Sequence, residues 1–254
     1  MKTIYQCSDT VTGVFSAVYD AWKAGCDERK MGIALKDEMN LRLFGEYVQV
    51  EESERKAAVV QNTIEKHMGP DAALAIYQAA LSADSLKGDA ILGTIAEARR
   101  ISDSRKIMNH LGNPSVEKVF ELSRSVGIEA HLFLGFVRFR ELENRVLFSE
   151  IEPKSQVLTC IADHFAGRLP LENWMIYDRT HQMFLVHEAK KRWVLVSGEG
   201  IERIRKISSS EAEAEFTRLW CGFCESISIA ERTSRKRQMQ HLPLHFRQDM
   251  VEFQ

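Results

Sequence analysis

The spacing of hydrophobic residues changes near residue 130, and this change constrains the fold more than any other feature of the sequence. Before it, apolar residues recur about every 3.6 positions, as on one face of an α-helix; after it, apolar and polar residues alternate, as on a β-strand. Helices segregated from strands in this way are typical of the α+β class. We therefore expect a helical N-terminal half followed by a small antiparallel sheet with packed helices.

The N-terminal half is predicted to be helical apart from a few short strands. Helical spacing runs from about Thr12 to Lys23 and again through residues 54–105. Gly69-Pro70 divides the second stretch, because proline suits the first turn of a new helix. The remaining elements expected here are a short strand at residues 3–6, two short strands within residues 32–50, and a helix that starts after Asn113-Pro114.

Beyond residue 130, the alternating pattern predicts a hairpin whose strands are residues 136–140 and 145–152. Glu143-Asn144 supplies the polar turn between them. Further along, the pattern predicts a helix at 157–166, three short strands near 174–177, 183–187 and 192–196, a helix at 211–227, and a short helix between Pro243 and Phe253.

No linker, internal repeat or low-complexity segment stands out, so we expect residues 1–254 to form one compact unit. Its parts would be a helical part (about 1–130), a mixed part (about 131–230) and a basic C-terminal arm (about 231–254). No apolar run approaches the roughly 18 residues needed to cross a bilayer. The N-terminus is not that of a secretory signal either. We expect a cytoplasmic protein without membrane contact.

Positive charge gathers near the C-terminus, although the chain as a whole has a net charge of -2. Any contact with nucleic acid must therefore come from a local patch. Residues 232–247 contain basic residues and no carboxylate. Guanidinium groups suit phosphate oxygens, so this stretch is a candidate DNA-binding arm, and a solvated charged helix is the alternative. The candidate DNA-binding residues are Arg232, Arg235, Lys236, Arg237 and Arg247.

A second group of polar residues surrounds the expected junction of helix and strand near residue 130. Glu129 and His131 could form a polar pocket there, with arginines as a phosphate cradle. The alternative is that the arginines lie on a solvated sheet face, paired with nearby glutamates. The candidate phosphate-binding residues are Arg124, Arg138, Arg140 and Arg168. The candidate catalytic residues are Glu129, His131, His164 and Asp178, which would have to lie within hydrogen-bond reach in one cleft.

The common catalytic and nucleotide-binding motifs are missing from the sequence. It has no phosphate-binding P-loop, no Gly-x-Gly-x-x-Gly, no Gly-x-Ser-x-Gly and no His-Glu-x-x-His. Cys221 and Cys224 have a metal-like spacing, but zinc needs a second pair of ligands. Beside Leu219, Trp220 and Phe223, the two thiols are expected to pack in a buried helix face. We predict no metal and no cofactor.

Several collinear segments resemble a bacterial family of DNA metabolism or DNA repair proteins that share a domain of unknown function. The segments are Phe15–Trp22, Gly135–Leu142, His164–Asp178 and parts of Leu242–Phe253. The resemblance covers nearly the whole chain. The polar signature of the family falls on Arg124, Glu129, His131, Arg138, Glu152, His164, Arg168, Asp178 and Arg232.

This resemblance implies an association with DNA repair. Members of the family accompany a radical-SAM protein that resembles DNA photoproduct lyases, and some are fused to a module resembling uracil-DNA glycosylase. Our first hypothesis is a DNA-binding accessory protein of such a repair enzyme, with no activity of its own. The second is an enzyme acting on a nucleobase or phosphodiester, and the third is a protein-binding adaptor without DNA contact.

Overall fold

The computed structural model describes residues 2–25, 27, 29–36, 43–229 and 234–253. We expected one unit from the sequence, whereas the contacts divide the chain into two: unit 1, Met1–Ile128, and unit 2, Glu129–Gln254. The boundary lies next to the change of hydrophobic pattern near residue 130. The α+β class is confirmed, and each unit has its own sheet.

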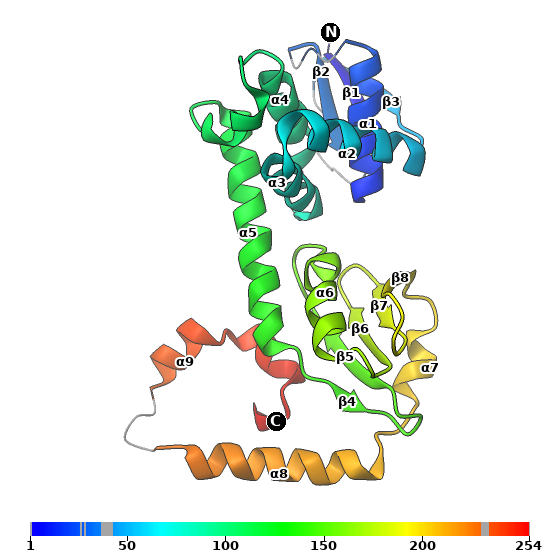
Figure 1. The fold of residues 1–254 in the computed structure, drawn as a ribbon, viewed down its shortest axis with the longest axis vertical. Helices are drawn as coiled ribbons and strands as arrows, with labels where there is room; N and C mark the ends of the chain where they lie inside the picture. Colours follow the sequence, from blue (N-terminus) through cyan, green and yellow to red (C-terminus); the bar gives the residue numbers. More distant parts are fainter. Residues whose placement is uncertain (1, 26, 28, 37–42, 230–233, 254) are drawn as a thin grey trace. The chain divides into compact units, whose positions relative to one another are not determined.

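Unit 1 combines a parallel sheet with a set of helices (Figure 1). Its sheet has the order β2-β1-β3, and β1 pairs in parallel with both neighbours. The strands are β1 (Lys2–Cys7), β2 (Met31–Leu35) and β3 (Gly45–Gln49). The helices are α1 (Val11–Lys23), α2 (Glu54–Met68), α3 (Pro70–Leu81), α4 (Lys87–Ala98), the 3-10 helix η1 (Ser104–Asn109) and the first part of α5 (Pro114–Phe136).

The predicted break between two helices at Gly69-Pro70 is confirmed. Gly69 has φ 85°, in the region that favours glycine, and it ends α2 while Pro70 opens α3. At the other end of α2, the Ser53 hydroxyl accepts a hydrogen bond from the Lys56 N–H at 3.5 Å and caps the helix. Local sequence signals thus fix both ends of α2.

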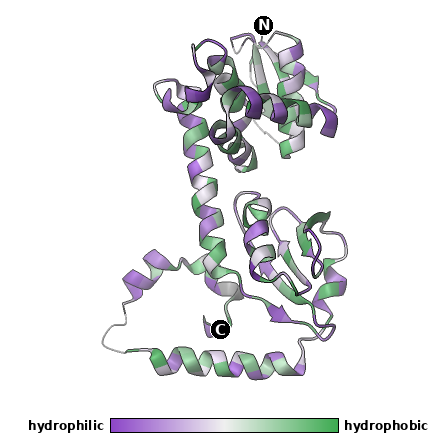
Figure 2. Cartoon of the chain, viewed as in Figure 1, coloured by the Kyte–Doolittle hydropathy of each residue, from purple (hydrophilic) through white to green (hydrophobic). Residues whose placement is uncertain are grey.

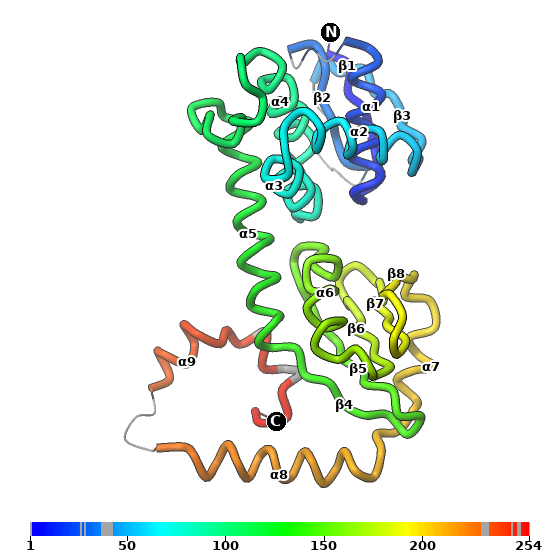
Figure 3. The backbone as a smooth tube through the Cα atoms, viewed as in Figure 1, coloured from blue at the N-terminus to red at the C-terminus, as the bar shows by residue number. Residues whose placement is uncertain are grey.

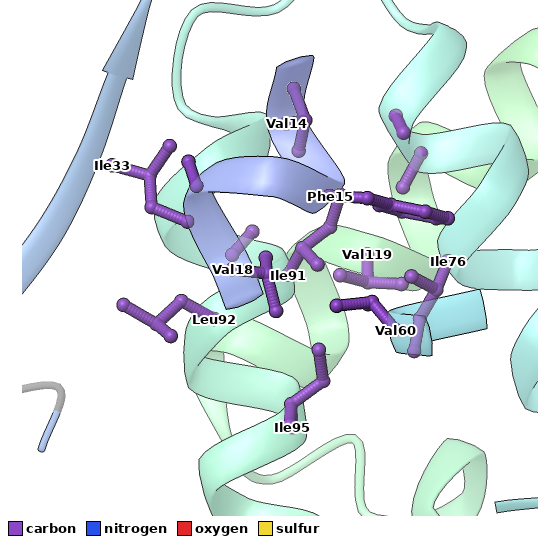
Figure 4. Packing of buried hydrophobic residues seen from close by; sticks show 14 of the residues in the cluster. Val14, Phe15, Val18, Ile33, Val60, Ile76, Ile91, Leu92, Ile95 and Val119 are labelled. Atoms are coloured by element: carbon purple, nitrogen blue, oxygen red, sulfur yellow. The ribbon is translucent and has the colours of Figure 1, made fainter. Parts of the chain in front are cut away.

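The core of unit 1 is a closed cluster of aliphatic side chains around Phe15 (Figure 4). Its helices each contribute the face that their 3.6-residue spacing marks as apolar. Members that are at most 2% exposed include Val14, Phe15 and Val18 from α1, Ile33 from β2, Val60 from α2, Ile76 from α3, Ile91, Leu92 and Ile95 from α4, and Val119 from α5.

Unit 2 contains a five-stranded sheet in sequential order, β4-β5-β6-β7-β8. We expected an antiparallel sheet, but β5 and β6 pair in parallel, so the sheet is mixed. The cause is helix α6 (Leu158–Arg168), which returns the chain to the end of the sheet where β5 began (Figure 3). The strands are β4 (Arg140–Glu141), β5 (Leu147–Ile151), β6 (Trp174–Asp178), β7 (Met183–His187) and β8 (Val194–Ser197).

The predicted hairpin after residue 130 is present, but its first strand is much shorter than expected. Helix α5 continues to Phe136, and β4 contains two residues, with Arg140 opposite Phe148 on β5. The ring of Phe136 packs on Phe246 with centroids 4.8 Å apart, a contact made by the helical end of α5. The predicted strand contained both Arg138 and Arg140, whereas in the structure Arg138 lies between helix and strand and only Arg140 belongs to β4.

The C-terminal segments of unit 2 differ sharply in burial. Helix α8 (Glu211–Ile227) matches its predicted bounds but buries none of its residues, although hydrophobic and hydrophilic residues alternate along it (Figure 2). The end of the chain, in contrast, places Phe246 and Met250 in buried positions. The remaining elements are α7 (Ile201–Arg205), α9 (Arg235–His241), η3 (Leu244–Asp249) and η4 (Val251–Phe253). No helix in the described ranges is long and apolar enough to cross a membrane.

Candidate functional site

Two cavities of unit 2 share the segment that joins α5 to β4. The first, which we call the Arg168 cavity, has a volume of about 590 Å³. The second, the α8 cavity, has a volume of about 1000 Å³. Arg138, Phe139 and Leu147 line both cavities. Arg138 and Phe139 therefore form a common wall.

The Arg168 cavity brings together three of the predicted site residues: Arg138, His164 and Arg168. His164 and Arg168 are four residues apart on α6 and therefore lie on one face of the helix. Phe139 fixes the opposite wall, because its ring meets the buried ring of Phe165 edge-on, with centroids 5.5 Å apart. The other lining residues are Leu134, Gly135, Val137, Leu147 and Leu169.

The three basic side chains of this cavity differ in their partners. Arg138 forms an ion pair with Glu252 at 3.1 Å and donates to the Gly135 carbonyl at 2.9 Å. His164 and Arg168 are exposed, and neither forms an ion pair with a residue in the described ranges. Two cationic or potentially cationic groups at this cavity therefore remain available to an anion.

Glu129 and Asp178 have structural partners away from this cavity. The Glu129 carboxylate accepts hydrogen bonds from the N–H groups of Lys154 at 2.6 Å and Ser155 at 3.1 Å, which orders the turn before α6. Asp178 is 1% exposed and accepts hydrogen bonds from the Thr180 and His181 N–H groups.

The Asp178 carboxylate also contacts the His181 Nδ1 at 2.6 Å. Asp178 and Trp174 lie at opposite ends of β6. The Trp174 ring contacts Phe165, which lines the Arg168 cavity, so Asp178 lies at the end of the strand away from that contact. The His131 ring is exposed on α5. The structure thus leaves Glu129, His131 and Asp178 outside the lining that contains His164, so the four candidates do not form the single cleft of our second hypothesis.

The glutamates that we considered as partners of Arg138 and Arg140 bind other residues. Glu150 pairs with Arg205 at 2.8 Å and with Arg179 at 3.8 Å, and Arg179 reaches Glu152 at 3.6 Å. The hydrogen bond and charge of Glu150 raise the pKa of Arg205. Arg140 instead lies over the Phe148 ring, 5.3 Å from its centroid, and donates to the Ser209 hydroxyl at 3.3 Å. Arg140 lines the α8 cavity.

The predicted basic arm divides into available and engaged residues. Arg235, Lys236 and Arg237 are exposed on α9, and none pairs with an acidic residue in the described part of the chain. Arg247 donates twice to the Leu242 carbonyl, at 3.3 and 3.1 Å, and lies over the Phe253 ring, so it holds the arm together. Of the other candidates, Arg124 is exposed on α5 in unit 1, and Arg232 lies outside the described residues.

The expectation that Cys221 and Cys224 pack in a buried helix face is wrong. Both thiols are half-buried, and their neighbours Leu219, Trp220 and Phe223 are 55%, 42% and 52% exposed. This face of α8 borders the α8 cavity instead of a closed core. Among the described residues, no group of three or more His, Cys, Asp or Glu side chains could hold a metal ion.

Sequence reasoning missed the residues that shape the α8 cavity. Phe216, Trp220 and Phe223 recur at helical spacing, which marks a common face but not whether that face is covered. Ser149 on β5 lines the same cavity and gave no signal at all. Glu252, the partner of Arg138, lies 114 residues away in sequence.

Comparisons with known proteins give a family but no activity. The sequence profile of DUF4130, a domain of unknown function, matches residues 87–252, and the comparison with curated proteins gives no match. Among solved structures, a DHH-domain protein described as a member of a family of ribosomal proteins aligns with 12% sequence identity. That alignment covers 80% of this chain and 75% of the other at a TM-score of 0.31, which is too low to support any argument. The profile match spans well over half of the chain, so the protein belongs to the DUF4130 family.

Proposed function

We propose that unit 2 binds nucleic acid through phosphate contacts and serves as an accessory factor in DNA repair, without chemistry of its own. One observation carries the proposal. Four of the basic residues that the sequence singled out, Arg168 on α6 and Arg235, Lys236 and Arg237 on α9, are exposed and form no ion pair with any acidic residue the structure describes.

Unpaired cations matter because a paired one must give up its carboxylate before it can neutralise a phosphate. Some other basic residues of unit 2 are paired, such as Arg138 with Glu252, and Lys191 with Glu188 at 2.8 Å. The whole chain has a net charge of -2, so it has no general attraction for polyanions. A contact with nucleic acid would therefore concentrate on the unpaired groups.

The link to DNA repair rests on the family resemblance of the sequence segments. By that resemblance, the protein would work beside a radical-SAM or uracil-DNA-glycosylase-type partner in the cytoplasm. The separate positions of His164, Glu129 and Asp178 favour this accessory role over an independent nucleobase- or phosphodiester-processing enzyme. An adaptor without DNA contact is the outcome to expect if the binding test below fails.

The test compares two triple variants with the same loss of charge. R235Q/K236Q/R237Q removes the α9 cations, and K190Q/K191Q/R192Q removes three exposed cations from the loop after β7. Fluorescence anisotropy would follow binding of labelled single-stranded and duplex DNA over a range of salt concentrations. Each lost phosphate contact lowers the log–log salt slope by roughly 0.7 on single strands and 0.9 on duplex DNA.

We expect the α9 variant to lower the log–log salt slope by up to roughly 2 on single strands. Arg168→Gln should lower it by the equivalent of one phosphate contact, roughly 0.7. The control triple should retain the wild-type slope. Equal flattening by both triples would reduce the effect to net charge and remove α9 from the proposal. Absence of binding by the wild-type protein to either DNA would overturn it.

A further inference from the structure

The α8 cavity is lined by aromatic rings from two sides. Phe216, Trp220 and Phe223 project from α8, and Phe139 and Phe148 lie on the β4–β5 side. The Trp220 and Phe223 rings are 5.8 Å apart at an interplanar angle of 31°. The two sides differ in exposure: Phe216 on α8 is 65% exposed, whereas Phe148 on β5 is 1% exposed. The cavity thus combines exposed rings on α8 with a buried ring on β5.

A buried hydroxyl in this lining has no hydrogen-bond partner. Ser149 is 3% exposed, and its Oγ makes no hydrogen bond within the described part of the protein. Leaving a buried polar group unsatisfied costs about 1–3 kcal/mol, so such groups are rare without a reason. Because Ser149 lines the α8 cavity, a ligand seated there could supply the missing partner.

Around the cavity, the carboxylates have hydrogen-bond or ion-pair partners, whereas one guanidinium, that of Arg140, lacks an ionic partner among the described residues. Glu213 accepts from the Glu141 N–H at 2.8 Å, and Glu150 is paired with Arg205. Arg140 has a single hydrogen bond, to the Ser209 hydroxyl at 3.3 Å, and no ion pair with a described residue. A ligand with aromatic rings, hydrogen-bonding edges and negative charge fits this combination.

We propose that the α8 cavity receives unstacked bases of a single-stranded nucleic acid. The α8 rings would stack on base faces, the Ser149 hydroxyl would hydrogen-bond a base edge, and Arg140 would contact the adjoining phosphate. A volume of about 1000 Å³ is at the upper end of the range for small-molecule sites, which leaves room for a nucleotide. This inference rests on the nucleic-acid binding proposed above and names the form of nucleic acid.

An amphipathic helix of a partner protein is the competing occupant. Aliphatic side chains would be sufficient to receive such a helix, and a lining with a partnerless hydroxyl and an unpaired guanidinium would hinder its apolar face. Five of the lining residues are aromatic (Phe139, Phe148, Phe216, Trp220 and Phe223), and only Leu147, Leu219 and Val251 are aliphatic. The lining therefore favours planar rings over aliphatic side chains.

The experiment measures the contribution of the bases separately from that of the phosphates. The probes are a single-stranded oligothymidylate and an abasic strand with the same length and charge. Wild-type protein is compared with F216L/F223L, which keeps an apolar helix face but removes two rings, and with Ser149→Ala. Phe120→Leu is the matched control, because Phe120 is an exposed phenylalanine (44%) in unit 1. Circular dichroism checks that each variant is folded.

We expect wild-type protein to bind the thymidylate strand at least tenfold more tightly than the abasic strand, because stacking contributes on the order of 1–3 kcal/mol per base. F216L/F223L should lose most of this preference, Ser149→Ala should lose part of it, and Phe120→Leu should retain it. The abasic strand should bind all four proteins alike.

Each other outcome identifies what fails. If wild-type protein binds both strands equally and with a salt slope that depends on α9, the base site is wrong and the phosphate proposal stands. If it binds neither strand, the proposed function itself fails. A folded F216L/F223L variant that keeps the full base preference overturns the cavity assignment. A wild-type protein without base preference that binds an amphipathic helical peptide at α8 makes the cavity a protein-docking site.

Discussion

Units 1 and 2 use similar helices and strands but treat their apolar residues differently. In unit 1, the helices close around Phe15, which is 2% exposed. In unit 2, α8 also carries an apolar face but leaves Phe216 65% exposed beside a cavity. Closed packing is what stability requires, whereas an open aromatic face gains nothing until something covers it. We therefore expect unit 1 to contribute mainly to stability and propose unit 2 as the binding unit.

Charged residues show the same contrast. In unit 1, the Lys87 side chain is fully buried, where it donates to the Ser82 carbonyl at 2.6 Å and pairs with Asp9. A buried ammonium of this kind is tolerable only because it is paired. In unit 2, Arg168 and the α9 cations remain exposed and unpaired among the described residues. The cation buried in unit 1 thus supports the fold, and the unpaired cations of unit 2 are available to a ligand.

The largest expected effect is on stability, and it compares the same substitution in both units. Phe15→Ala should lower the free energy of unfolding by about 3–5 kcal/mol, because it opens a cavity in a closed core. Phe216→Ala should change it by at most about 0.5 kcal/mol, as for other exposed positions. Urea unfolding followed by circular dichroism measures both. Similar losses for the two variants would mean that α8 is packed in solution and would break the comparison.

The second prediction concerns thiol reactivity. Burial is the main factor that raises the pKa of Cys7 in unit 1 to about 12. At pH 8, the thiolate fraction should therefore be on the order of a thousandfold below that of a thiol with the ordinary pKa of about 8.5. Cys221 and Cys224 are half-buried on α8. Alkylation with iodoacetamide, resolved by peptide mass spectrometry, should therefore modify those two thiols well before Cys7.

The rate of Cys7 modification should rise about tenfold per pH unit, since the thiolate is the reactive form. Modification of Cys7 as fast as of the α8 thiols would show that the core of unit 1 opens readily. Such a result would contradict the division into a closed and an open unit.

A smaller effect is expected from Glu129, which we first considered a catalytic residue. Glu129→Ala removes the acceptor of two backbone N–H groups before α6 and should destabilise the protein by about 1–2 kcal/mol. His131→Ala on the same helix should change stability by no more than about 0.5 kcal/mol. Thermal unfolding measures both. Equal stability of the two variants would reopen the question of what Glu129 does.

The smallest effect concerns the ion pair of Asp84 and Lys118 in unit 1, with N–O distance 2.8 Å. Burial alone would raise the pKa of Asp84, but hydrogen bonds from Lys118 and the Leu86 N–H outweigh it and lower the pKa. A carboxyl with a lowered folded-state pKa contributes stability above its unfolded value, about 3.9, and loses it as pH falls further.

Asp84→Asn should therefore cost no more than about 1 kcal/mol at pH 7, and the difference from wild type should vanish at about pH 2–3. Urea unfolding at several pH values measures this difference. A difference that is independent of pH would assign the effect to packing and not to charge.

Local signals in the sequence predicted most of the elements. The bounds of α8 and the break at Gly69-Pro70 followed from spacing and capping, which act within a few residues. Strand direction did not follow, because alternation shows that Leu147–Ile151 is a strand but not that β6 lies parallel to it. The strand expected at residues 136–140 is largely absent, because α5 continues to Phe136 and the ring of Phe136 packs on Phe246, which is distant in sequence.

The site was predicted only in part. Family resemblance pointed to Arg138, His164 and Arg168, and they do share one cavity. Whether each cation is free could not be predicted, since the partner of Arg138 is Glu252, far away in sequence. The open face of α8 was mistaken for core because apolar spacing is the same in both cases.

Hydrogen–deuterium exchange with and without single-stranded DNA tests the division of roles most directly. The expected result is slower exchange in α8, at residues 138–139 and in α9 when DNA is bound, with the helices of unit 1 unchanged. Protection that appears mainly in α1 to α4, or that is absent from unit 2 at saturating DNA, would contradict the assignment of nucleic-acid binding to unit 2.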